Sequence, residues 1–155
     1  MTRPSENTEM TSNTDKAYAY VTWEGQLLVF EHPEHPEAGI QVPGGTIESG
    51  ESPRAAVVRE VREEADLTDV EVVEKLGTDT FDMSEWRDEI QQRHFFWLRC
   101  TETPPENWRG YERDHGEPIP LDFYWVEMDE IPDLHAGQGE YLGRLLEPDV
   151  TEGDL

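Results

Sequence analysis

The sequence predicts an α/β protein with a mixed β-sheet sandwiched between α-helices. One observation behind this is a well-delimited helix: Ser52 is a favourable N-cap, Pro53 suits the first helical position, and apolar periodicity lasts to about Ala65. A second is residues 91–101, a strand candidate with apolar side chains on both faces, which is typical of a central strand covered on both sides. Alternating runs before and after the helix supply further strands.

The other elements follow from local patterns of turn residues and alternation. Residues 17–23 and 26–30 form a predicted hairpin around the turn at Glu24 and Gly25. Further along the chain we expect a loop at 32–39, a short extended piece at 40–42, strands at 70–73, 78–83 and 121–128, a long loop at 101–120, and a last helix at 137–147. One domain, residues 16–147, is therefore expected between loose tails at 1–15 and 148–155.

The composition is strongly acidic. Against 36 Asp and Glu there are 12 Lys and Arg, which gives a formal net charge of −24. Because nucleic acids and anionic membranes are also negatively charged, this charge argues against nonspecific binding to either. Such a surface stays hydrated while salt screens its self-repulsion, so we expect a protein of a high-salt cytoplasm. The expected oligomeric state is a monomer or a homodimer. The single cysteine, Cys100, excludes an intramolecular disulfide, and no apolar run indicates a signal peptide or membrane span.

Residues 45–67 carry charged side chains in a fixed spacing. Five residues separate Gly45 from Glu51, and seven more separate Glu51 from the run REVREEADL at 59–67. In a helix, the glutamates at 60, 63 and 64 share one stripe, and the apolar residues at 57, 58, 61 and 65 share another that can pack on a sheet. The acidic stripe is expected to face solvent. Arg59 is expected to point off that stripe and to brace Glu51 through a charge-assisted hydrogen bond.

Three clustered carboxylates repel one another unless a cation lies between them. Mg²⁺ or Mn²⁺ suits such a cluster, because hard cations take oxygen ligands. A metal held there can bind phosphate oxygens and lower the pKa of a bound water. Gly44 and Gly45 lack a Cβ and so allow the backbone to approach the metal and the substrate closely. An acidic helix face is usually only solvated, but this pattern needs four glutamates, an arginine and a glycine in register.

The pattern resembles the Nudix box, with Asp66 at the position where the family usually has a glycine that ends the helix with positive φ. Aspartate is among the few residues that tolerate such a conformation. The resemblance implies the Nudix fold, and a divalent-metal-dependent hydrolase that cleaves a phosphoanhydride bond in a nucleoside diphosphate linked to another group. A non-catalytic nucleotide sensor is the alternative, but such domains commonly lose box carboxylates, and this sequence retains them all.

The same resemblance implies the residues of the site. The catalytic residues it implies are Glu51, Arg59, Glu60, Glu63 and Glu64. The ligands that it implies for Mg²⁺ or Mn²⁺ are the Gly44 carbonyl, Glu60, Glu63 and Glu64, with Glu60 either ligating metal or helping to deprotonate water. Our candidates for substrate binding are Gly45, Arg54, Arg87, Arg93 and Glu117.

Three further groups of residues leave alternatives open. A carboxylate outside the box often assists in this family, and the sequence does not choose among Glu112, Asp114 and Glu117. Five of the ten arginines fall between residues 87 and 113, where they either line a site for a phosphorylated substrate or pair with neighbouring acids. His32 and His35 could form a pair of metal ligands, but the prolines that flank them break the regular spacing of such a pair, so they are expected to be exposed loop residues.

Overall fold

A computed structural model describes residues 12–113 and 116–145. The sheet has seven strands, six of them in the order β4-β5-β1-β2-β7-β6, and β3 pairs with β1. The β1–β5 pair is parallel and the other pairs are antiparallel, so the sheet is mixed as predicted. The strands are β1 Ser12–Trp23, β2 Gln26–Glu31, β3 Gly44–Thr46, β4 Val70–Asp82, β5 Glu89–Cys100, β6 Asn107–Glu112 and β7 Ile119–Glu127.

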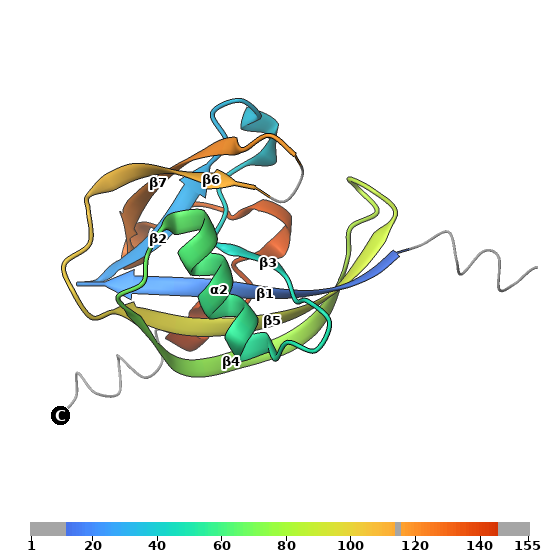
Figure 1. Ribbon diagram of the computed structural model, residues 1–155, viewed down its shortest axis with the longest axis horizontal. Coiled ribbons are helices and arrows are strands. Elements are labelled where there is room, and N and C mark those ends of the chain that lie inside the picture. Colours follow the sequence, from blue (N-terminus) through green and yellow to red (C-terminus); the bar gives the residue numbers. More distant parts are fainter. Residues whose placement is uncertain (1–11, 114–115, 146–155) are drawn as a thin grey trace, which may run out of the picture.

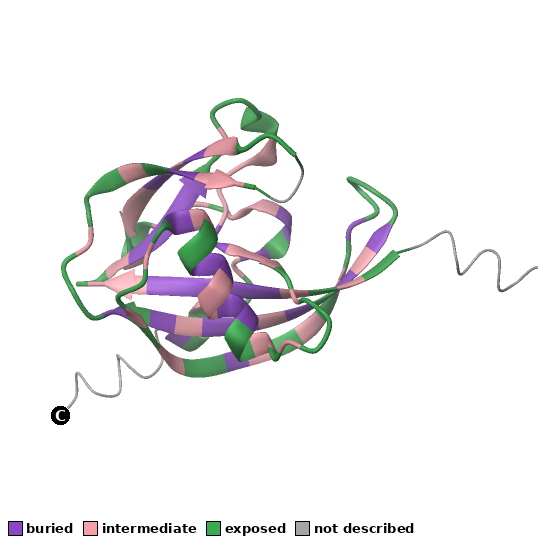
Figure 2. Cartoon of the chain, in the orientation of Figure 1, coloured by how far each residue is buried: buried purple, intermediate pink, exposed green. Residues whose placement is uncertain are grey.

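Two apolar cores lie on the two faces of this sheet. The helix α2, Pro53–Ala65, crosses one face (Figure 1). Its buried apolar side chains pack against those of β1, β2, β5 and β7. The opposite core is covered by the segment after β7, which contributes Leu134, Tyr141, Leu142 and Leu145. Figure 2 shows that β1 is buried in its middle, where Ala17, Tyr18, Ala19, Tyr20 and Val21 lie between these two layers. The central β5 contributes Phe96 to one core and Phe95 to the other, which confirms its predicted two-sided burial.

Helix α2 begins and ends as its sequence predicts. The Ser52 hydroxyl accepts a hydrogen bond from the Ala55 N–H at 3.1 Å, and Pro53 is the first helical residue. At the other end, Asp66 adopts the left-handed conformation, with φ 57° and ψ 35°, and its N–H donates to the Arg62 carbonyl. Asp66 therefore has the backbone conformation expected of the glycine it replaces.

Several strand boundaries differ from the predicted ones. β1 begins at Ser12, so residues 12–15 belong to the sheet and not to a tail, while residues 1–11 lie outside the described part of the chain. The predicted strands at 70–73 and 78–83 form one strand, β4, whose register shifts twice where it pairs with β5. Gly44 and Gly45, expected to follow an extended piece, lie in β3 and pair with Tyr18 and Ala17 of β1.

The predicted long loop at 101–120 is wrong, because β6 lies within it. The prolines and glutamates around this strand obscure the alternation of apolar and polar residues that would predict it. The strand is stabilised by contacts with distant parts of the chain. Its Trp108 ring stacks on Phe123 at a centroid distance of 5.4 Å, and the Trp108 indole N–H donates to the Ala65 carbonyl at 2.8 Å. A Cβ on Gly110 would lie 2.0 Å from the Glu64 carbonyl oxygen, so β6 packs directly against the end of α2.

The segment after β7 contains less helix than predicted. It contains the short 3-10 helices η2 Met128–Glu130 and η3 His135–Gly137, and another 3-10 helix, η1 Pro36–Ala38, lies between β2 and β3. Residues 138–141 form turns and residues 142–145 are helical, while the remainder of the predicted helix at 137–147 lies outside the described residues. Within residues 12–113 and 116–145, no helix has the length and apolar character needed to cross a membrane.

Candidate active site

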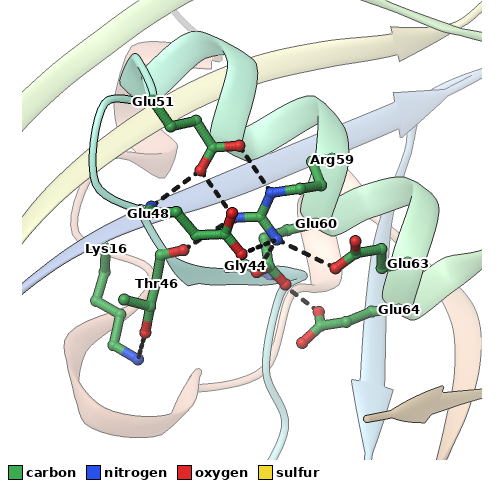
Figure 3. Close-up of polar contacts among 9 residues, drawn as sticks. All are labelled: Lys16, Gly44, Thr46, Glu48, Glu51, Arg59, Glu60, Glu63 and Glu64. Carbon is green, nitrogen blue, oxygen red and sulfur yellow. Dashed lines mark hydrogen bonds and ion pairs between the residues drawn. The ribbon is translucent and has the colours of Figure 1, made fainter. Parts of the chain in front are cut away.

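Arg59 fixes the loop before α2 against the helix. Its Nε and Nη2 donate to the two carboxylate oxygens of Glu51 at 2.7 and 2.9 Å, and Nη2 also donates to the Thr46 carbonyl at 3.0 Å (Figure 3). The Glu51 carboxylate also accepts the backbone N–H of Glu48 at 2.9 Å. The bonds from Arg59, and then that from Glu48, hold the pKa of Glu51 near 2. The predicted brace between Arg59 and Glu51 is therefore present.

The guanidinium of Arg59 also reaches the acidic stripe, which differs from the prediction that it points away. Its Nη1 donates to Glu60 at 2.9 Å and to Glu63 at 3.1 Å, and it lies 3.8 Å from the carboxylate of Glu48. One cation thus faces four carboxylates, those of Glu48, Glu51, Glu60 and Glu63. The attraction of each carboxylate for this charge offsets the mutual repulsion expected in so acidic a cluster.

Glu60 is buried, whereas the sequence predicted that the acidic stripe would face solvent. Its exposed fraction is 3%, and its carboxylate lies against the backbone of β3. A Cβ on Gly45 would lie 2.3 Å from Glu60 Cδ, and a Cβ on Gly44 would lie 2.5 Å from the Ala17 carbonyl oxygen. The Gly44 N–H donates to Glu64 Oε1 at 3.2 Å. The two glycines therefore let the backbone of β3 lie against Glu60 and β1, while their predicted approach to a metal and a substrate stays a prediction.

The carboxylates have suitable chemistry for a metal, but they are not arranged around one. Among the described residues, no three or more His, Cys, Asp or Glu side chains are grouped so that they could hold a metal ion. Nη1 of Arg59, which contacts both Glu60 and Glu63, occupies the space between them. Glu60 and Glu64 nevertheless point their carboxylates toward one another (Figure 3), and oxygen donors of this kind fit Mg²⁺ or Mn²⁺. Because the guanidinium is planar and rigid, Nη1 stays in place while Nε and Nη2 donate to Glu51, so a metal here would require the side chains of Glu60 and Glu63 to rotate away from Nη1.

A cavity of about 540 Å³ opens beside these residues. Glu60 and Glu64 line it at one side, together with Gly44 and Gly45. Of the candidates for substrate binding, Gly45, Arg87 and Arg93 line it, whereas Arg54 and Glu117 are exposed and lie outside its lining. Glu63 lines a neighbouring cavity of about 300 Å³, which it shares with Glu60 and Glu64.

A protein-family model that matches most of the chain identifies its family. A model of the NUDIX domain matches residues 13–145. The chain belongs to the Nudix family. The matched residues include the whole box and all seven strands except Ser12. No curated protein matches the chain.

Solved structures show the same Nudix fold at low sequence identity. A UDP-X diphosphatase has 18% identity and a TM-score of 0.59 over 94% of this chain and 72% of its own. An ADP-ribose pyrophosphatase from Streptococcus suis has 23% identity and a TM-score of 0.57, covering 88% and 91%. A MutT protein from Methanosarcina mazei has 17% identity and a TM-score of 0.61, covering 90% and 96%. At these identities the likeness establishes the fold alone.

His32 was not assigned to the cavity from the sequence, and Glu112 was one of three candidate carboxylates among which the sequence did not choose. His32, expected to be exposed, has a side chain that is only 11% exposed, and its Nε2 lies 3.5 Å from Glu112 Oε1. His32 continues the alternation of Leu28 and Phe30, two buried residues of β2, and this pattern was the available signal. Glu112 lines both cavities and ends β6; of the other two candidate carboxylates, Glu117 lines neither and Asp114 lies outside the described residues.

Of the arginines between residues 87 and 113, Arg87 and Arg93 line the cavity, and others pair with acids. Arg87 pairs with Glu89 and also lines the cavity of the Nudix domain. Arg99 pairs with Glu71, and Arg109 donates to Asp122 at 2.9 Å. Glu71 and Asp122 lie on the strands that pair with those of Arg99 and Arg109, so these two arginines pair with acids that are distant in sequence. Glu89, in contrast, begins β5 and lies two residues after Arg87.

Proposed function

We propose that this chain, a Nudix-type pyrophosphohydrolase, cleaves the phosphoanhydride bond of a nucleoside diphosphate linked to another group. The observation that carries the proposal is the convergence of Glu60 and Glu64 beside Gly44 and Gly45, at the side of a cavity large enough for a small molecule. Two proteins of similar fold, a UDP-X diphosphatase and an ADP-ribose pyrophosphatase, are named for substrates of this class.

Nudix hydrolases generally use divalent metal ions, and we infer Mg²⁺ or Mn²⁺ here. The oxygen donors available to hold it are the carboxylates of Glu60, Glu63 and Glu64 and the Gly44 carbonyl. When bound, the metal supplies a positive charge that neutralises phosphate oxygens and makes a water more acidic. Metal binding requires Glu60 and Glu63 to break their hydrogen bonds with Arg59 Nη1, which donates to them at 2.9 and 3.1 Å.

The residues of the chain position the reactants. Arg59 keeps the loop that carries Thr46 and Glu51 next to α2, and so holds the glycines in register with Glu60. We assign Glu112 the role of general base: one of its carboxylate oxygens takes the proton of the attacking water. The reason is that Glu112 lines the same two cavities as Glu60. Water oxygen then bonds to phosphorus, the anhydride P–O bond breaks, and the leaving phosphate departs with that electron pair.

The test is a panel of nucleoside diphosphate derivatives, nucleoside triphosphates and dinucleoside polyphosphates with Mg²⁺ or Mn²⁺, scored by phosphate-containing products. We expect turnover of at least one nucleoside diphosphate derivative and its abolition by EDTA. Turnover that persists unchanged in EDTA contradicts the metal-dependent mechanism. Tight nucleotide binding without product in any member of the panel indicates a sensor instead of an enzyme.

A further inference from the structure

Arg93 is a buried cation in the cavity wall, on β5. It is 1% exposed and yet lines the cavity. Its Nε donates to Gln91 Oε1 at 2.9 Å, its Nη1 donates to the Ala136 carbonyl at 2.6 Å, and its Nη2 lies 3.4 Å from the sulfur of Met83. The guanidinium stacks on the Phe81 ring at 4.0 Å. Within the described part of the chain, its hydrogen bonds therefore go to neutral groups alone.

The other two arginines of the cavity differ from Arg93. Arg59 pairs with several carboxylates, and Arg87 pairs with Glu89. Arg93 has no carboxylate within 4 Å among the described residues, although Asp79 and Glu140 act on it at longer range. Burial lowers the pKa of Arg93, but an arginine stays protonated in a protein. A buried charge without a partner is costly, and this one retains N–H groups that no oxygen accepts.

Tyr18 connects Arg93 with the carboxylates of the box. The Arg93 guanidinium lies 5.3 Å from the centre of the Tyr18 ring, and the Tyr18 hydroxyl donates to Gln91 Oε1 at 3.3 Å. The Tyr18 ring also contacts β3, because a Cβ on Gly44 would lie 2.5 Å from Tyr18 Cδ1. The cavity therefore has an acidic side at Glu64 and a cationic side at Arg93, with Tyr18 between them.

We propose that Arg93 is a substrate-binding residue that takes an anionic oxygen group, a phosphate or a carboxylate, on the part of the substrate remote from the scissile anhydride. The preferred substrate is then a nucleoside diphosphate derivative with an additional negative charge. This rests on the proposed function for the position of the anhydride, but the anion site itself does not. A bound anion would compensate the positive charge of Arg93, and its oxygens would accept charge-assisted hydrogen bonds from the N–H groups that no protein oxygen accepts.

The first experiment measures anion binding without metal or turnover. Inorganic phosphate is titrated into the full chain in EDTA at fixed ionic strength, by calorimetry and by NMR of the arginine Nε–H groups. We expect binding by the wild type, a shift of the Arg93 Nε–H signal, and affinity about ten- to hundredfold weaker in Arg93→Met. Arg99→Met is the control, because Arg99 lies on the same strand, is exposed and pairs with Glu71.

The wild-type spectrum keeps this experiment decisive even if Arg93→Met does not fold. Phosphate that leaves the Arg93 Nε–H signal unmoved overturns the proposal. Equal phosphate affinity in wild type and a folded Arg93→Met also overturns it. A failure of the proposed function is separate, because it appears as lack of turnover with metal while Arg93-dependent phosphate binding in EDTA persists.

The second experiment distinguishes an anionic group of the substrate from free phosphate. Matched pairs are compared with metal present: UDP-glucose with UDP-glucuronate, and ADP-ribose with its 2′-phosphate. In at least one pair we expect kcat/KM to favour the anionic member about tenfold or more, and Arg93→Met to remove that preference through KM. No preference in either pair, or a preference that Arg93→Met leaves intact, overturns the substrate assignment.

Discussion

Gly45→Ala tests how closely β3 fits the carboxylate of Glu60. The new Cβ would lie 2.3 Å from Glu60 Cδ and 2.5 Å from both carboxylate oxygens, so Glu60 must retreat by about 1 Å to reach ordinary contact. A displacement of that size in a catalytic group costs about a hundredfold in rate. Overpacking of this kind also costs about 1–3 kcal/mol of stability. We therefore expect kcat to fall about a hundredfold in a protein that remains folded.

The assay compares kcat, thermal melting and Mn²⁺ affinity by calorimetry for wild type and Gly45→Ala. Gly143→Ala is the matched control, because a Cβ there meets nothing within 4 Å and its φ is not left-handed. We expect the control to match wild type in all three measurements. Wild-type kcat and Mn²⁺ affinity in Gly45→Ala would refute the tight contact between β3 and Glu60, and with it the role given to this glycine.

Three further predictions concern stability. Asp66→Gly should raise the melting temperature by the equivalent of up to about 1 kcal/mol, because Asp66 has a left-handed φ of 57°; a lower melting temperature contradicts this. Because the folded pKa of Glu51, about 2, lies below its ordinary 4.5, its stabilisation is present above pH 4.5 and lost as pH falls toward 2. The melting-temperature gap between wild type and Glu51→Gln should therefore narrow over that range, and a constant gap contradicts the pairing with Arg59. With a net charge of −24, melting should occur at higher temperature in molar KCl than in dilute buffer, and an equal or lower value removes the halophile inference.

The helix and the box could be read from the sequence because their signals are local. The cap at Ser52, the left-handed end at Asp66 and the brace from Arg59 to Glu51 each depend on residues close in the chain, and all three are present. The spacing also placed Glu60 and Glu64 on the same side of the helix. The depth of a side chain cannot be inferred from spacing along a helix, so the burial of Glu60 under β3 was not predicted.

The parts that were missed depend on contacts between distant segments. Strand β6 is held by β7 and by the end of α2, and its own residues alternate only weakly. Glu112 reaches the cavity only because that strand exists. Arg93 was a candidate for substrate binding, but its isolation from carboxylates arises from β4 and the segment around Ala136, which are remote in sequence.

The central claim is that the box carboxylates perform metal-dependent hydrolysis, and Glu60→Gln and Glu64→Gln test it most directly. Each substitution keeps the size of the side chain and removes one negative charge. We expect a bound metal to supply several kcal/mol of the barrier reduction through charge stabilisation, and each 1.4 kcal/mol is about tenfold in rate. Glu74→Gln, an exposed position on β4, is the control.

The decisive measurement is kcat beside the melting temperature for these three variants and the wild type. We predict that Glu60→Gln and Glu64→Gln lose about a hundredfold or more in kcat while each still melts cooperatively within a few degrees of wild type, and that Glu74→Gln keeps both values. Wild-type turnover in the two box variants, or activity lost only because they unfold, would contradict the claim and identify the box as a structural helix of a nucleotide sensor.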